Sequence, residues 1–491
     1  MLKHKSTYVI LIAIHLALLA IFAAYRLIDA DEGVYFSAAR MVSEGMSVYT
    51  DFFYTQLSMM PTIFAPFAQG GWESFYILRG FAVLAGLFSA LLFLVIIWKL
   101  SQDNKTTTII MIAYLFSGII IAWNATFKAL PFCHFMSLAV FFFWLRFYEK
   151  KNLSSLIMTG LFLSALINFR SVFAVLLPFY LISIGLMSEN KKLRNLIVFM
   201  VSLIPLTIPT LMKIIESPQN FKYGNWVFQL YREGDNSLGH VLSNRMEFFL
   251  RALADPHLLI IFVLTVISIL LLIRQKAFSG IKDIFVKPEG AALMNLLLIA
   301  GVHLIPNPIS RQYINQFMAF ALIIISFNFK FIYDWFISKF SLSVVRIISY
   351  GIAGIYILSL VPYCTIFIFG SRDYDRRYNL SEVRAVTEHM LKVATESDTV
   401  LSEWPGYAFI TEQTPLRYSE IIGTEFDLPM SHEEYLKYNL GDGEYFRDEI
   451  GKATPKLIVF QNNPSSSYAD LLEQNYEQSF KSDVVSVYKR K

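Results

Sequence analysis

The chain has 491 residues, of which 55% are hydrophobic and 16% charged, and its formal net charge is +4. Soluble domains carry roughly 25% charged residues, so this composition excludes an ordinary soluble enzyme. The small net charge gives no support for nucleic acid as a partner. Many runs reach the ~20 apolar residues that cross a bilayer. The chain is therefore predicted to be a polytopic α-helical membrane protein.

Eleven apolar runs are predicted to be transmembrane helices. In chain order they cover residues 8–27, 75–98, 107–124, 129–147, 155–169, 172–188, 194–212, 257–273, 291–305, 313–331 and 345–370. The first run is too long for the apolar core of a signal peptide, and no small-residue cleavage pattern follows it. Both cysteines, Cys133 and Cys364, fall inside apolar runs, which favours small buried side chains over a disulfide.

The basic residues alternate between successive loops. If Lys3 and Lys5 lie in the cytoplasm, the loops on that side each hold several cations, whereas the opposite short loops hold mostly one. This asymmetry predicts an N-terminus inside and a C-terminus outside a cytoplasmic (inner) membrane. Three segments then lie outside: residues 28–74, the polar loop 213–256 and the tail 371–491.

The tail differs in character from the apolar region, 1–370, which is expected to form the membrane domain. Val383, Val386 and Met390 recur at a helical spacing, and "TVLSE", "KLIVF" and "VVSVYKR" are typical of short strands. "SHEEYLKYN" begins with Ser431 and places Glu434 three residues later, which is a capping-box pattern. Helices that alternate with strands indicate a small extracytoplasmic α/β domain over 371–491.

The stretch "DADEGVYFSAARMVSEG" follows the first apolar run. The spacing of its apolar residues predicts a short amphipathic helix at the outer membrane interface. Asp29, Asp31 and Glu32 stand at its start, where acids can simply cap the helix. Because consecutive helical residues point about 100° apart, Asp31 and Glu32 cannot both face one pocket. A cap and a catalytic carboxylate both stay open at this point.

Three cations on the outer side are candidates for binding a phosphate. Arg311 follows the two prolines of "HLIPNPISRQY" and precedes Tyr313. Its guanidinium is suited to a forked contact with phosphate, although snorkelling to lipid headgroups is the alternative. Lys128 and Arg170 are each isolated in a very short outer loop, where an interfacial anchor is again the alternative.

The first outer segment, "DEGVYFSAARMVSEGMSVYTDFFYTQLSMMPTIFAPF", resembles the first outer loop of bacterial glycosyltransferases with the GT-C fold. Within them it is most similar to the branch of protein O-mannosyltransferases and lipid A aminoarabinose transferases. The shared pattern is carried by Asp31, Glu32, Tyr35, Ala38, Gly45, Tyr49, Asp51, Phe52 and Pro61. "SRQYINQFMAFALIII", "DTVLSEWPGYAFITEQTPLRY" and "PKLIVF" resemble later parts of these enzymes.

The resemblance implies a GT-C-like membrane domain that transfers a sugar from a polyprenyl-phosphate donor to a glycan, lipid or protein acceptor outside the membrane. Asp31 would be the base that deprotonates the acceptor during an inverting attack, and Glu32 would orient the acceptor or Asp31. Arg311 with Lys128 or Arg170 would hold the phosphate, a leaving group that needs positive charge rather than an acid. Tyr35, Gln56 and Tyr313, which belong to the same motifs, are further candidates for binding the substrate or its phosphate.

This chain departs from the family at one position. Relatives often have a lysine, thought to bind the donor phosphate, where this chain has "TQLSMMP", so Gln56 or Leu57 stands near that position. Its role then passes to one of the three cations or is absent. No cofactor is firmly predicted and no metal ligand cluster is evident, although Asp29 and Asp31 could bind a hard divalent cation. A ligase or polymerase of lipid-linked polysaccharide and a lipid-glycan flippase or transporter are the alternative functions.

Overall fold

The computed structural model describes residues 5–231, 237–304, 309–370, 373–421, 428–461 and 466–491. Within these residues every one of the predicted apolar runs is helical. The corresponding elements are α1 (Lys5–Tyr25), α4 (Gly71–Ser101), α5 (Asn104–Leu115) with α6 (Gly118–Asn124), α7 (Ala129–Lys150), α8 (Leu153–Phe169), η3 (Ser171–Val175) with α9 (Leu176–Met187), α10 (Lys192–Glu216), α14 (Pro256–Arg274), α16 (Pro288–Leu304), η6 (Arg311–Tyr313) with α17 (Ile314–Lys339), and α18 (Leu342–Leu358) with α19 (Leu360–Phe367).

Seven helices in the described part of the chain are long and apolar enough to cross a membrane. The pair α5 and α6 passes the same test together but is bent by 55° at its break. The helices at 153–169, 171–187 and 288–304 are apolar but shorter. The protein is thus a multi-pass α-helical membrane protein, and the number of spans stays a prediction.

The segments expected outside the membrane contain helices of their own. The first holds α2 (Ala30–Ser43), as its apolar spacing predicts, and α3 (Met59–Phe64). The segment 213–256, expected as a polar loop, holds α11 (Pro218–Lys222), α12 (Phe228–Tyr231) and α13 (Leu238–Leu253), while α15 (Ile281–Val286) joins α14 to α16. Pro306 and Pro308, the two prolines that precede Arg311 in the sequence, lie outside the described residues.

The C-terminal part combines short helices with one five-stranded sheet in the order β2-β1-β3-β5-β4. β1 is parallel to β2 and β3, whereas β5 is antiparallel to β3 and β4. The expected helix and strands are present, and Ser431 caps α22 in the expected capping box. The elements are α20 (Leu380–Val393), β1 (Thr399–Ser402), α21 (Gly406–Thr411), β2 (Thr414–Pro415), α22 (His432–Lys437), α23 (Gly443–Gly451), β3 (Leu457–Gln461), α24 (Ala469–Asn475), β4 (Tyr476–Lys481) and β5 (Val485–Arg490).

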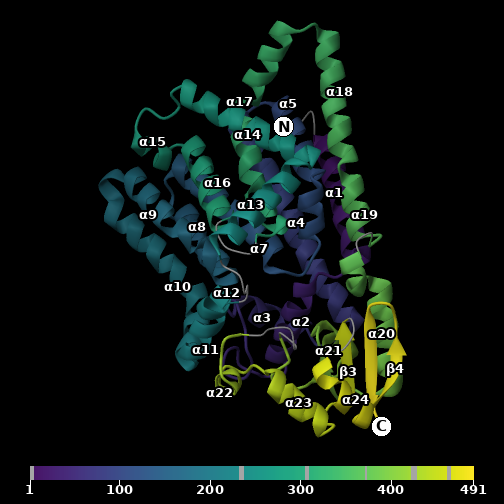
Figure 1. Cartoon of the computed structure of the whole chain (residues 1–491). Coiled ribbons are helices and arrows are strands. Elements are labelled where there is room, and N and C mark those ends of the chain that lie inside the picture. The colour runs from purple at the N-terminus through teal and green to yellow at the C-terminus, as the bar shows by residue number, and fades with distance from the viewer. Residues whose placement is uncertain (1–4, 232–236, 305–308, 371–372, 422–427, 462–465) are drawn as a thin grey trace.

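The sheet lies at one end of the helical bundle, and α2 and α3 lie between the two (Figure 1). One cluster of buried residues runs from the membrane helices through α2 into the C-terminal part, where it includes Val383, Trp404 and Val459. The membrane helices and the C-terminal part therefore share one apolar core, and burial at roughly 25 cal/mol per Å² stabilises their contact. As a result α2, with its acidic start, is enclosed by helices on one side and by the sheet region on the other.

Candidate functional site

The start of α2 divides the three acids between two roles. Asp29 is the N-cap residue, with φ −79° and ψ 137°, and its carboxylate accepts a hydrogen bond from the Asp31 backbone N–H at 3.1 Å. Glu32 returns the contact by accepting from the Asp29 N–H at 2.9 Å, which completes a capping box. The Asp31 side chain takes no part in this cap and is 57% exposed.

Lys128 brings Asp29 and Asp31 together. Its ammonium lies 2.8 Å from Asp29 Oδ1 and 2.6 Å from Asp31 Oδ2. A third contact, at 2.6 Å, goes to the amide oxygen of Gln312. Burial alone would raise the pKa of Asp29, but the charges of Lys128 and Arg26 hold it below its ordinary value. We call Asp29, Asp31 and Lys128 the charged centre.

The short helix η6 sends three consecutive side chains in different directions. Arg311 pairs with Asp255 at 2.8 Å and donates to the Tyr363 hydroxyl at 3.2 Å. Gln312 contacts Lys128, and Tyr313 lies under Arg170, whose guanidinium carbon is 4.9 Å from the ring centroid. Successive residues of a 3₁₀ turn point about 120° apart, so η6 places Arg311 on one side of the charged centre and Tyr313 on another.

Arg170, Tyr35 and Gln56 form the side that includes Tyr313. Arg170 makes no ion pair with a carboxylate among the residues that the structure describes. The Gln56 amide donates to the Tyr35 hydroxyl at 2.5 Å. Burial raises the pKa of Tyr35 to about 12, and the charges of Arg170, Asp31 and Lys128 all act on it. Four of the predicted side chains therefore converge next to the charged centre.

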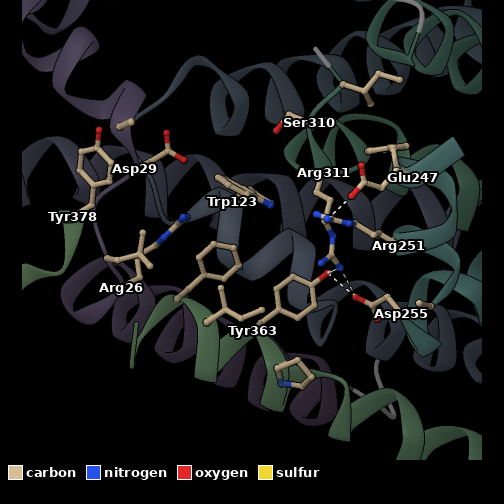
Figure 2. A pocket seen from close by; sticks show the side chains of 18 of the residues that line it. Arg26, Asp29, Trp123, Glu247, Arg251, Asp255, Ser310, Arg311, Tyr363 and Tyr378 are labelled. Atoms are coloured by element: carbon tan, nitrogen blue, oxygen red, sulfur yellow. Dashed lines mark hydrogen bonds and ion pairs between the residues drawn. The ribbon is translucent and has the colours of Figure 1, made fainter. Parts of the chain in front are cut away.

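Arg311 lies instead on a cavity of about 710 Å³ on the other side. Figure 2 shows Arg26 and Asp29 on one side of Trp123, and Arg311 with Asp255 and Tyr363 on its other side. α13 and the start of the C-terminal part also contribute to the lining, through Asn244, Glu247, Phe248, Arg251, Arg377 and Tyr378. Asp29 is the member of the charged centre that borders this cavity, whose size suits a ligand.

Solved membrane glycosyltransferases share this architecture. ArnT from Cupriavidus metallidurans, a lipid A aminoarabinose transferase solved bound to undecaprenyl phosphate, superposes with a TM-score of 0.68 at 12% identity, over 99% of this chain and 98% of that one. The oligosaccharyltransferase of Archaeoglobus fulgidus superposes with a TM-score of 0.55 at 12% identity, over 93% of this chain and 69% of that one. The chain has the GT-C fold. No family model matches it, and no curated protein matches it by sequence.

In this GT-C fold the C-terminal part packs directly on α2. The Arg40 guanidinium donates to the backbone carbonyls of Ala408, Glu412 and Gln413 at 2.8–3.1 Å. At the other end of the helix, Trp404 Nε1 donates to the Ala30 carbonyl at 3.0 Å. α2 therefore has contacts from the C-terminal part at both ends, and these limit how its acidic start can move.

One ion pair beneath the charged centre is missing from the sequence-based prediction. Glu32 is wholly buried, and its carboxylate pairs with Arg79 of α4, which is wholly buried too. Glu32 thus points into the protein while Asp31 points out, as their 100° separation requires. The sequence held one signal for Arg79, because a charged residue inside an apolar run marks a paired or functional position.

Metal binding has a limited basis in the described residues. Lys128 lies between the Asp29 and Asp31 carboxylates, where a cation bound by both would sit. The one group of three metal-ligating side chains found in the described ranges is His432, Asp442 and Glu444, in the C-terminal part. Asp442 already caps α23 and contacts His432, so the cluster has a structural explanation.

Proposed function

We propose that the chain transfers a sugar from a polyprenyl-phosphate carrier to a hydroxyl group of an acceptor on the outer face of the cytoplasmic membrane. The observation that carries this proposal is the charged centre, where the exposed Asp31 carboxylate meets the buried Lys128 ammonium and where Asp29 borders the 710 Å³ cavity. The fold supports the general reaction, because its solved neighbours include ArnT bound to undecaprenyl phosphate. An archaeal oligosaccharyltransferase was solved with a dolichol-phosphate and an inhibitory peptide.

Asp31 is the proposed base. As the acceptor oxygen attacks the anomeric carbon, Asp31 takes the hydroxyl proton, the carbon–phosphate oxygen bond breaks, and the polyprenyl phosphate leaves with inverted stereochemistry at the sugar. Asp31 is the exposed member of the charged centre and lies outside the helix cap, so its oxygens can reach a substrate. Lys128 fixes its direction, since one Asp31 oxygen lies 2.6 Å from the ammonium.

Arg170 is the proposed main contact of the donor phosphate. It is a cation without a carboxylate partner in the described part of the chain, and the Tyr35 and Tyr313 rings lie against it or near it. The three donors of Lys128 already serve Asp29, Asp31 and Gln312. Lys128 therefore supplies positive charge and alignment, a role that replaces the lysine absent near Gln56. A role for Arg311 in donor binding stays a prediction.

Asp31→Asn tests the base directly. Because the Asp31 side chain is 57% exposed, its contact with Lys128 contributes about 1 kcal/mol or less, so folding and insertion should persist. Loss of a general base should lower turnover by roughly 10²–10⁴-fold in an assay with a labelled polyprenyl-phosphate sugar. Glu44→Gln is the matched control, because Glu44 is a half-exposed acid at the C-cap of α2 that pairs with Arg40 instead. Near-normal turnover of Asp31→Asn would place the base elsewhere.

The same assay separates the alternative functions. Transfer of one labelled monosaccharide supports the proposal, whereas transfer of a whole lipid-linked glycan would make the chain a ligase or polymerase. If no sugar is transferred but labelled lipid changes leaflet in vesicles, the chain is a transporter. Topology is tested separately: the proposal requires residues 28–74 and 371–491 on the outer side, which cysteine labelling in intact cells measures.

A further inference from the structure

Arg79 occupies an unusual position for a charged residue. It stands in the interior of α4, one of the long apolar helices, and its side chain is wholly buried. Its Nε donates to Glu32 Oε1 at 2.9 Å and its Nη2 donates to Glu32 Oε2 at 2.6 Å. This is the forked two-bond geometry that a guanidinium forms with a carboxylate and an ammonium cannot.

The other donors of Arg79 reach the end of α1. Nη1 donates to the carbonyls of Ala23 at 2.8 Å and Arg26 at 3.3 Å, and Nη2 reaches that of Leu27 at 3.5 Å. α1 ends at Tyr25, so the Ala23 carbonyl is one of the four that a helix leaves without partners at its C-terminus, and those of Arg26 and Leu27 follow directly after the helix. Arg79 thereby fixes the last turn of α1, just before the chain reaches Asp29.

Glu32 connects this ion pair to both parts of the charged centre. Its Oε1 also accepts from the Phe127 N–H at 2.8 Å, and its Oε2 accepts from the Asp29 N–H at 2.9 Å. Phe127 is the residue before Lys128. The Glu32 carboxylate therefore holds the backbone of Phe127, next to Lys128, and also the backbone of Asp29, whose side chain pairs with Lys128.

We propose that Arg79 is a positioning residue: by orienting Glu32, it sets the distance between Lys128 and the acids at the start of α2. This role rests on the function proposed above, since alignment of Asp31 matters only if Asp31 reacts. A buried ion pair adds little stability over an apolar pair of the same size, so alignment is the better reason for placing two charges here.

Arg79→Lys tests the role while it keeps the charge. Lysine has no fork, so it can hold one Glu32 oxygen but not both oxygens and the α1 carbonyls. We expect kcat to fall on the order of 100-fold, as it does for a misplacement of about 1 Å, with little change in the donor KM. The control is Tyr180→Phe, which removes a buried hydrogen bond to Asn295 at 3.0 Å in a distant part of the bundle. If Arg79 only stabilises the fold, each of the two variants should lose activity in proportion to the decrease in its melting temperature.

A second measurement does not depend on activity. Hydrogen–deuterium exchange of the full-length protein in nanodiscs should speed up at the Asp29 and Phe127 amides in Arg79→Lys but not in Tyr180→Phe. If exchange increases while the wild-type protein transfers no sugar, the positioning holds and the proposed function fails. Unchanged exchange at both amides would overturn the positioning role. Glu32→Gln reports on the same pair if Arg79→Lys does not insert, with the same expected increase in exchange.

Discussion

Lys128→Met tests how much the buried ammonium of the charged centre contributes to stability. Methionine keeps most of the length of the lysine side chain and removes its charge. The Lys128 side chain is 3% exposed and that of Asp29 is 15% exposed, so the variant leaves a mostly buried carboxylate without its counter-ion. Removing one partner of a buried pair costs 3–5 kcal/mol, and the partial exposure of Asp29 favours the lower end, about 3 kcal/mol.

The pH dependence of this loss has a definite sign. In the wild-type protein the pKa of Asp29 is held below its ordinary value, so the pair contributes stability above the ordinary pKa and loses it as the pH falls. Without Lys128, burial, which is the largest influence on Asp29, is expected to outweigh the remaining charge of Arg26, and the pKa of Asp29 rises. The folded variant then gains by binding a proton, so the free energy of unfolding should drop more at pH 8 than at pH 5.

Denaturant titration in detergent at the two pH values measures the effect. Adding Asp29→Asn to Lys128→Met should recover much of the lost stability at pH 8, because it removes the uncompensated charge. Turnover should stay low in both variants, since Asp31 has lost its alignment. Lys99→Met is the control, because its ion pair with Glu149 is about 30% exposed and should contribute less than about 1 kcal/mol. Equal losses in Lys128→Met and Lys99→Met, or no recovery in the double variant, would refute the reasoning.

Three further predictions address other parts of the protein. Arg311→Ala should raise the apparent donor KM about tenfold, the value of one charge-assisted hydrogen bond, and an unchanged KM would remove Arg311 from the donor site. Gly33→Ala would place a methyl group 2.4 Å from Trp404, so limited proteolysis should release the C-terminal part faster, whereas Gly80→Ala, with open space around it, should not change the rate. Burial raises the pKa of Glu420 from 4.5 to about 7, so the folded state binds its proton more tightly than the unfolded state. Stability should therefore fall by up to about 3 kcal/mol as the pH rises from 4.5 to 7, and Glu420→Gln should abolish that slope in a thermal-denaturation series.

The parts of the fold that depend on local sequence were predictable. Apolar runs located the long helices, because a bilayer requires about 20 apolar residues whatever the rest of the chain does. The start of α2 was also predictable from local sequence, since capping and the 100° turn per residue act over only four residues. The segment 213–256 was expected as a polar loop because α13 is amphipathic, with too few apolar residues for a span.

The contacts of the charged centre were not predictable, because they join residues that lie far apart in the chain. Lys128 and Arg170 both read as cations in short loops, and only the fold shows that one is fully engaged by three oxygens while the other has no carboxylate partner in the described residues. Arg311 and Tyr313 are two positions apart and were expected to act together. The 3₁₀ turn of η6 sends them to different sides.

The acids at the start of α2 combine the two roles that the sequence left as alternatives. A carboxylate that caps a helix is fixed by its backbone contacts, and a fixed carboxylate can orient a second one beside it. Asp29 makes the cap and shares Lys128 with Asp31, so the cap supplies the alignment that a base at Asp31 needs. Glu32 anchors the same turn to Arg79 in the membrane helices. The desolvation cost of placing three acids at the start of α2 is thereby offset by two buried cations, and one carboxylate, that of Asp31, stays exposed for substrate.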